Sequence, residues 1–586
     1  MYLSTALSFL KLNIGGSRRA LNAQPFNPAV FQFPDVDLSW MMKKMDGAPP
    51  PEYFFDATKI KRLIKRVAKL TVGLKLTQNR VNRASAERVF EEFFTDITPL
   101  VPKPKRLIKH WDNDKELARQ MLCGVNPVMI MVTKDLSQLS DNIATHFGER
   151  KLQGLIDEKR LFFVSYDDIA ELEVNPHQGK PAPMNPTPQD DPRPFYAPIA
   201  IFALDETRKE LDIMGIQLER TDDAKVYTKA DGNEWLFAKI HLSSTDSNIH
   251  EWVSHLGKTH LTMEPHILAI HNTLKMKDHK VYTFLAPLCK DTLFLNCKCN
   301  VLTFFEIHSI AIIHFHHKFI TKGAARKTLA GFSAGAFGDE QSSIGVGQFM
   351  QINRNWWSTY NFFESSGLPS ELASRGFDKD FDMPPYLFRE DGMQLWDAYG
   401  EFAADFVNEI YKSDAEVNED DDIQAWAKET SAFDKAAVPG FPATIKDKVT
   451  LVNILQTLMW IPSGLHAAVN FPQYDFYAYA PNKPLAMRAL LPASNCEDIF
   501  KNALPTVANA QQIITTTTIL TLPSQDCIDN LQNNFSTIGN KSYTKFQSKL
   551  DEIGDGIERR NKESKKAGNA VYSYLNPSVV PASIDI

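Results

Sequence analysis

Apolar residues recur at intervals of three and four along most of the chain after residue 200, which is the spacing of an amphipathic α-helix. Residues 1–100 instead hold proline-rich stretches and lack the alternating pattern of a β-sandwich. The pattern predicts a mainly α fold, with one large helical domain over 101–586 and a few small β elements. It also predicts an N-terminal extension over 1–100 without a β-sandwich.

The extension contains one helical stretch, KIKRLIKRVAKLTVGLK at 59–75, whose apolar positions share one face and whose polar positions are basic. A surface helix docked on the main domain is the simpler interpretation of this pattern. Transient contact with a membrane surface is the alternative.

One segment, CKCNVLTFFEIHSIAIIHFHHKFI at 297–320, breaks the helical pattern because it is apolar, β-branched and nearly uncharged. It has about the length of a membrane span, but Glu306 and four histidines argue against one. Its Cys-x-Cys followed by histidines is similar to a zinc ligand set, although the spacing matches no standard zinc finger. The segment therefore needs a separate explanation.

The charge balance gives no indication of a nucleic-acid partner, because 64 basic and 71 acidic residues leave a net charge of −7.

The six scattered cysteines predict no disulfide scaffold and favour a reducing compartment, most simply the cytoplasm. Residues 1–24 carry Lys11, Arg18 and Arg19 and no acidic residue, which is weakly similar to a transit segment. Organelle import is therefore the alternative location.

Three histidines in HEWVSHLGKTH at 250–260 follow one another every five residues. Five residues of α-helix rotate by about 500°, which leaves such neighbours about 140° apart. A π-helical turn brings residues i and i+5 nearly into line and is often found at functional sites. The spacing is not that of the HExxH zinc proteases, because three residues separate Glu251 from His255. Spacing alone leaves three unrelated histidines as an open alternative.

A second pair, His466 and Asn470 in LHAAVN, lies four residues apart and so shares one helical face. The small Ala467 and Ala468 would let this helix pack closely against another. An amide oxygen is a weak ligand beside imidazoles. Three imidazoles with weak oxygen ligands leave exchangeable positions on a metal, which suits redox iron better than structural zinc.

A different chemistry is suggested by GFSAG at 331–335, which matches the G-x-S-x-G pattern of esterases with Ser333 as nucleophile. That pattern needs a strand before it and a helix after it. Here a helical composition precedes it and a glycine-rich stretch follows. A lipid esterase is therefore the alternative from another class of enzyme.

From about residue 105 to its end the sequence resembles the lipoxygenase family. The matching stretches occur in the order found in that family: WDNDKELARQMLCGVNP (111–127), WLFAKIHLSSTDSNIHEWVSHLGKTHLTMEPHILAIH (235–271), LPSELASRGF (368–377), REDGMQLWDAYGEF (389–402), GFP (440–442), HAAVNFPQYDFYAYAPNKPLAMR (466–488), IERRN (557–561), YSYLNP (572–577) and the terminal SIDI.

The resemblance implies that His255, His260 and His466 bind a catalytic non-heme iron, with Asn470 as a weak fourth ligand. The main-chain carboxylate of Ile586 would be a further ligand, and no catalytic residue is implied beyond the metal centre. The ligand set alone also admits manganese.

The resemblance further implies that Gln473 is an amide linking the metal helix to the substrate cavity. Its usual partner in the family is a glutamine, where this sequence has Glu251. This departure places a charge next to the metal ligands.

The implied reaction is dioxygenation of polyunsaturated fatty acids that contain a cis,cis-1,4-pentadiene. A ferric hydroxide removes a hydrogen atom from the bis-allylic carbon, and molecular oxygen then adds to give a hydroperoxide. No organic cofactor is implied. A catalytically impaired relative that binds lipid or metal is the alternative within the family.

In the substrate channel, Leu329 and Leu522 resemble leucines that clamp the pentadiene, and Ala325 resembles the alanine of S-specific members.

In the family a pair like Leu295-Asn296 is followed within a few residues by Ala-Arg. Here 297–320 separates that pair from Ala325, and joining Asn296 to Thr321 gives LNTKGAARKTL, which resembles an uninterrupted family helix. We therefore interpret 297–320 as an insertion, of which a translated intron is one origin.

Overall fold

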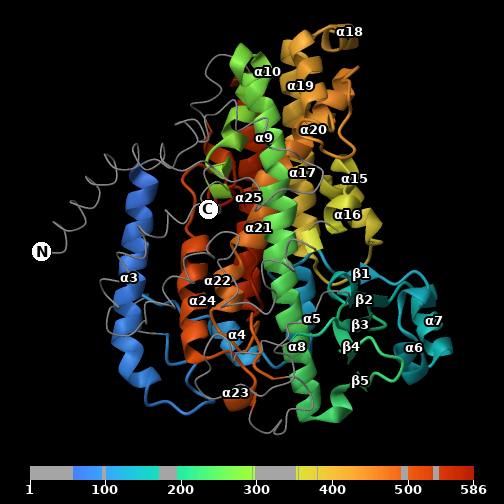
Figure 1. The fold of residues 1–586 in the computed structure, drawn as a ribbon, viewed down its shortest axis with the longest axis vertical. Helices are drawn as coiled ribbons and strands as arrows, with labels where there is room; N and C mark the ends of the chain where they lie inside the picture. The colour runs from blue at the N-terminus through green and yellow to red at the C-terminus, as the bar shows by residue number, and fades with distance from the viewer. Residues whose placement is uncertain are drawn as a thin grey trace, which may run out of the picture.

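The computed structural model describes residues 57–94, 100–170, 195–293, 295–296, 352–353, 355–378, 381–489, 499–531 and 540–586. The described part is mainly helical with one small sheet, as the periodicity predicts (Figure 1). Residues 1–56 and the interpreted insertion at 297–320 lie outside it, so the predicted domain boundary near residue 100 and the insertion remain predictions.

The principal α-helices are α3 (Ala57–Val81), α4 (Lys105–His110), α5 (Asp114–Cys123), α6 (Asp141–Phe147), α7 (Glu149–Asp157), α8 (Asn233–Ile249), α9 (Thr262–Asn272), α10 (Lys280–Leu285), α15 (Phe362–Ser366), α16 (Leu368–Ser374), α17 (Leu387–Ile410), α18 (Asp414–Asn418), α19 (Asp421–Ser431), α20 (Lys448–Trp460), α21 (His466–Asn470), α22 (Gln473–Tyr477), α23 (Ile499–Asn502), α24 (Val507–Leu520) and α25 (Asn540–Lys566). The strands are β1 (Met131–Val132), β2 (Leu161–Ser165), β3 (Ile199–Leu204), β4 (Leu211–Gln217) and β5 (Val226–Tyr227).

Helices α8 and α9 join through a π-helical segment into one continuous helix that runs through the middle of the molecule (Figure 1). Almost all of α8 is buried, including a run of small polar side chains. These hydroxyl and amide groups are tolerated because they bond to nearby main-chain carbonyls, as Ser247 does to Ser243 and Asn248 does to Ser244. The central helix is therefore surrounded by protein on all sides.

Helix α17 packs against both α20 and α25 beside this central helix. The rings of Phe402 on α17 and Phe546 on α25 stack with centroids 4.6 Å apart. At the end of α20 the indole of Trp460 is almost fully buried, between Gly392 of α17 and Gly464. Close helix packing at this point depends on the absence of side chains from both glycines.

The strands form one antiparallel sheet in the order β1-β2-β3-β4-β5, with a register shift in β3 between Ile201 and Phe202. One face of the sheet, including Phe162, joins the main core. The other face, including Phe163, packs with residues of α6 and α7. Because both faces are covered, β2 and β3 are almost entirely apolar and do not show the alternation by which strands are usually recognised.

Helix α3 contains the predicted basic stretch and lies beside α24 (Figure 1). Its buried residues Leu70 and Leu74 share a core with Phe237 of α8 and Ile514 of α24. The docked-helix interpretation is therefore confirmed.

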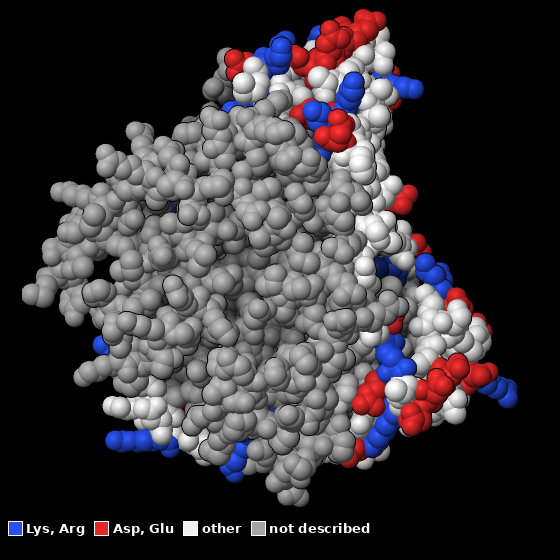
Figure 2. All heavy atoms as spheres, in the orientation of Figure 1, with Lys and Arg blue, Asp and Glu red and all other residues white. Residues whose placement is uncertain are grey.

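Charged side chains of both signs are interspersed on the described part of the surface seen in Figure 2, over α18 and α19 at the top and over α6 and α7 at the lower right. Such mixing is typical of a solvated surface. Within the described ranges, no helix combines the length and apolar character needed to cross a membrane.

Two glycine-to-alanine substitutions should have opposite effects on stability. At Gly464 a Cβ would lie 2.2 Å from the Trp460 ring, so Gly464→Ala should destabilise the fold by about 1–3 kcal/mol. At Gly556 in α25 a Cβ would meet nothing within 4 Å, so Gly556→Ala should stabilise the fold by about 0.5–1 kcal/mol. Urea unfolding of both variants measures the difference, and two shifts of the same sign would contradict this packing.

Candidate metal centre

Two widened helical turns face each other at the centre of the molecule. The first is the π-helix His250–Leu261 between α8 and α9, and the second is the π-helix Ile461–Leu465 between α20 and α21. They pack against each other, and α21 packs against the first. Proline near each turn, Pro265 in α9 and Pro462 in the second turn, lacks the amide hydrogen needed for regular α-helical bonding. The widened turn predicted from the histidine spacing is confirmed.

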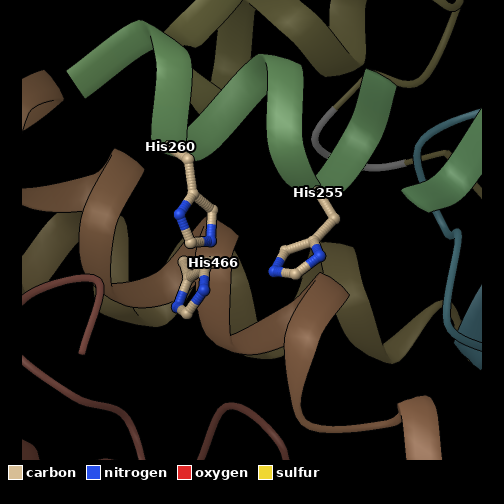
Figure 3. Close-up of side chains that lie close together, drawn as sticks. All are labelled: His255, His260 and His466. Atoms are coloured by element: carbon tan, nitrogen blue, oxygen red, sulfur yellow. The ribbon is translucent and has the colours of Figure 1, made fainter. Parts of the chain in front are cut away.

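His255 and His260 project from the first π-helix toward His466 on α21 (Figure 3). The potential ligand nitrogens of the three imidazoles all lie within 4.8 Å of one another, and all three residues are buried. The ring centroids are 5.0 to 5.4 Å apart. The structure therefore brings together the three histidines that the sequence predicts as metal ligands.

The chemistry of these imidazoles fits a metal ion. The Nε2 atoms of all three histidines are buried and, among the residues that the structure describes, have no hydrogen-bond partner. Burial lowers the pKa of His260 to about 4, and burial together with electrostatic repulsion from nearby basic groups lowers the pKa of His255 and of His466 well below its usual value. The rings are thus neutral at physiological pH, which is the form that binds metals.

The third histidine of the period-five series, His250, is engaged elsewhere. Its Nε2 lies 2.7 Å from the carbonyl oxygen of Val469, to which it donates, and its Nδ1 lies 2.7 Å from the hydroxyl of Tyr477. Both ring nitrogens therefore have protein partners. His250 ties the first π-helix to the α21–α22 region and leaves metal binding to the other two histidines.

Glu251 and Gln473 both lie near Nδ1 of His255, which is called here the far nitrogen because Nε2 is the one free to bind a metal. Glu251 Oε2 and Gln473 Nε2 each lie 3.4 Å from His255 Nδ1. Burial raises the pKa of Glu251, which favours the uncharged carboxylic acid, a group with nearly the shape of the glutamine amide usual in the family. Burial therefore opposes a charge on the glutamate at this position, while the nearby His250 favours one.

His260 contacts Asn296, a partner that the sequence does not indicate. Asn296 Oδ1 lies 3.4 Å from His260 Nδ1, while Asn296 Nδ2 donates to the carbonyl of His260 at 3.0 Å and to Glu264 Oε2 at 2.7 Å. Burial raises the pKa of Glu264 to about 7. The position of Glu264, four residues after His260 on the same helical face, could have indicated its role. Asn296 lies 36 residues from His260, so the spacing of neighbouring residues does not indicate their contact.

Asn470 is fully buried and held from two sides. Its Nδ2 donates to the carbonyl of Leu520 at 2.7 Å, and its Oδ1 accepts from Gln473 Nε2 at 3.0 Å. An amide oxygen has two acceptor positions, so one remains for a metal. Gln473 therefore contacts both Asn470 and His255, which links two of the predicted ligands.

The chain end lies close to this region. The side chain of Ile586 is buried in a small cluster with Leu522, Ile519 and two residues of α3, Leu63 and Val67. Leu522, predicted as a substrate clamp, is thus beside the predicted carboxylate ligand. Ala325, Leu329 and Ser333 lie outside the described residues.

Comparison with known proteins identifies a family. The family model described as Lipoxygenase matches residues 41–303 and 300–577. "Lipoxygenase 6, chloroplastic" of Arabidopsis thaliana is 28% identical over 543 residues, which are 82% of this chain and 54% of that protein. "Polyunsaturated fatty acid lipoxygenase ALOX8" of Mus musculus is 27% identical over 507 residues, which are 83% of this chain and 67% of that protein. The chain spans about half the length of the plant relatives it matches.

Solved structures share the fold. A lipoxygenase variant in complex with arachidonate superposes with a TM-score of 0.74 at 24% identity, covering 92% of this chain and 77% of that one. Coral 8R-lipoxygenase gives a TM-score of 0.72 at 24% identity, covering 92% and 76%. The family match spans most of the sequence, and the fold and the buried histidine cluster agree with it: the chain belongs to the lipoxygenase family.

Proposed function

We propose that this chain is a non-heme iron dioxygenase that converts polyunsaturated fatty acids with a cis,cis-1,4-pentadiene into hydroperoxides. The observation that carries the proposal is the set of three buried, neutral imidazoles with unpartnered Nε2 atoms in a lipoxygenase fold. The complex of a structural relative with arachidonate supports the class of substrate.

The residues that would hold the iron are His255, His260 and His466, with Asn470 and the carboxylate of Ile586. The bound iron would supply hydrogen abstraction from the bis-allylic carbon. The chain's own contribution is to keep the imidazoles neutral, to fix the rings of His255 and His260 through contacts at their Nδ1 atoms, and to exclude water by burial. A ligand set with only one carboxylate adds little negative charge, which suits a redox-active metal, either iron or manganese.

Other parts of the proposal rest on the sequence resemblance. Leu329 and Leu522 would clamp the substrate, and Ala325 favours S products. The interpretation of 297–320 as an insertion stays a proposal; the two stretches of the family match, 41–303 and 300–577, overlap within that segment. For location, we favour the cytoplasm because the described cysteines Cys123, Cys289 and Cys527 are free thiols. The transit-like N-terminus and the chloroplastic plant relatives support organelle import as the alternative.

Metal content tests the ligand assignment directly. His260→Ala should reduce bound iron from about one per chain to near zero, since it removes a ligand and leaves two imidazoles. His266→Phe is a matched control, because His266 is also buried and without hydrogen-bond partners but packs between Phe362 and Phe441. Elemental analysis of the purified proteins should show the loss in the first variant only. Equal iron in both variants would refute the assignment, and stoichiometric zinc would refute the redox function.

Conjugated-diene absorbance after addition of linoleate or arachidonate tests the reaction. The wild type should produce the diene, His260→Ala should produce none, and Ser333→Ala should match the wild type. Free acid released from an ester without diene formation, and lost in Ser333→Ala, would favour the esterase. Bound iron without either product would favour a catalytically impaired relative.

Contact with a lipid surface is part of the proposal, through the outward face of α3. Helix α3 contains no acidic residue, and its exposed positions include Lys61, Lys65 and Lys69 together with Val72 and Leu76, which are 50% and 66% exposed. A basic face with exposed apolar side chains fits an anionic bilayer surface, from which the fatty acid would be drawn.

Vesicle sedimentation tests this contact. Changing Lys61, Lys65 and Lys69 to glutamate should weaken binding to vesicles rich in phosphatidylserine by at least about 100-fold, since each lysine near the surface contributes about 1 kcal/mol. The matched control changes the exposed Lys549, Lys562 and Lys565 of α25 to glutamate. Equal binding by the two triple variants, or binding that does not weaken with added salt, would contradict the role of α3.

A further inference from the structure

Three cations on the inward side of α3 each bind main-chain carbonyl groups near the chain end. Arg66 Nε donates to the carbonyl of Thr518 and Arg62 Nη2 to that of Pro523, each at 2.6 Å. Lys59 Nζ donates to the carbonyl of Asp585. These contacts flank Leu522 and reach the residue before Ile586, so α3 holds the segments that surround the predicted carboxylate ligand.

Lys59 makes the most deeply buried of these contacts. Its Nζ lies 2.8 Å from Asp291 Oδ2 and 3.6 Å from Asp585 Oδ2. The side chains of Lys59, Asp291 and Asp585 are 11%, 3% and 10% exposed. An ammonium group buried between two carboxylates is held in a defined place, because each ion loses hydration that only its partners replace.

The position of the Asp585 carbonyl determines where Ile586 can lie. This carbonyl belongs to the planar peptide group that includes the amide nitrogen of Ile586. Only the Cα of Ile586 then separates that nitrogen from the terminal carboxylate. Ser524 Oγ also donates to Asp585 Oδ2 at 2.7 Å, and the Ile586 side chain packs against Leu63 and Val67 of α3. Ile586 is thus fixed through both its main chain and its side chain.

The second carboxylate partner of Lys59 connects this arrangement to a metal ligand. Asp291 has φ +65, a left-handed conformation that is uncommon for residues other than glycine and is maintained by surrounding contacts. The next residue, Thr292, donates through Oγ1 to the carbonyl of Ile584 at 3.3 Å. A short way along the same segment, Asn296 contacts His260. Residues 291–293 and 295–296 therefore contact both Ile584 near the chain end and the imidazole of His260.

We propose that Lys59 is a positioning residue that holds the terminal carboxylate of Ile586 toward the metal, so that docking of α3 and retention of the metal depend on each other. The proposal rests on the proposed function, because it assumes that Ile586 is a ligand. It gives the N-terminal helix a role in the metal centre although none of its residues is a ligand.

The rate of metal loss tests this role without a catalytic assay. Lys59→Met keeps a stem of similar length and removes the ammonium. It should accelerate the release of iron to excess EDTA by about tenfold or more, which is the range seen when groups supporting a metal ligand are removed. The double variant Lys59→Met with Asp291→Asn avoids leaving the Asp291 carboxylate buried without its cation and should show the same acceleration. The ferric electron paramagnetic resonance spectrum of both variants should differ from that of the wild type.

Two control variants separate positioning from simple docking. Lys61→Met changes an exposed cation of the same helix and should leave both iron release and thermal stability unchanged. Arg66→Met removes the bond to Thr518 and should lower the melting temperature while iron release stays within about twofold of the wild type. Equal acceleration in the Arg66 and Lys59 variants would overturn the specific role of Lys59, because docking alone would then explain it.

The outcomes also separate this proposal from the proposed function. If the wild type retains stoichiometric iron, His260→Ala loses it, and the Lys59 variants release iron at the wild-type rate, the positioning role alone is wrong. If the wild type retains no iron beyond the level of His260→Ala, the proposed function is wrong and the role of Lys59 falls with it.

Discussion

Three imidazole nitrogens that face one another in a buried space impose the main physical constraint on this molecule. A buried polar atom without a hydrogen bond costs about 1–3 kcal/mol, and the three Nε2 atoms share that condition. A metal ion would satisfy all three at once. Two histidines five residues apart can meet this requirement only on a widened turn, which is why the central helix changes to π-helical geometry between α8 and α9.

The surrounding polar groups restrict which way two of the three rings, those of His255 and His260, can face. Glu251 and Gln473 lie at the far nitrogen of His255, and Asn296 lies at that of His260. Such contacts select the tautomer and orient the ring, so they influence the affinity for a metal nearly as much as the ligands do. His250 resembles the two ligand histidines in spacing but has both nitrogens bonded within the protein, and this difference separates a structural histidine from a ligand.

The sequence predicted the features that depend on local spacing and could not predict those that depend on distant contacts. The i, i+5 spacing of His255 and His260 predicts the π-helix, and the apolar repeat at 59–75 predicts α3. Uniformly apolar β2 and β3 carry no alternation, so the strand positions were not predicted. The contact of Lys59 with Asp585 joins residues 526 positions apart, and no periodicity reports such a pair. Asn296 next to His260 was missed for the same reason.

The small cluster formed by Leu63, Val67, Leu522 and Ile586 cannot form until both of its parts have been synthesised on the ribosome. The apolar side of α3 is synthesised well before Leu522 and Ile586, its partners in that cluster. At synthesis rates of about 5–20 residues per second, the 526 positions between Lys59 and Asp585 correspond to a delay of roughly half a minute to two minutes. During that time the part of the α3 face formed by Leu63 and Val67 lacks its native partners Leu522 and Ile586.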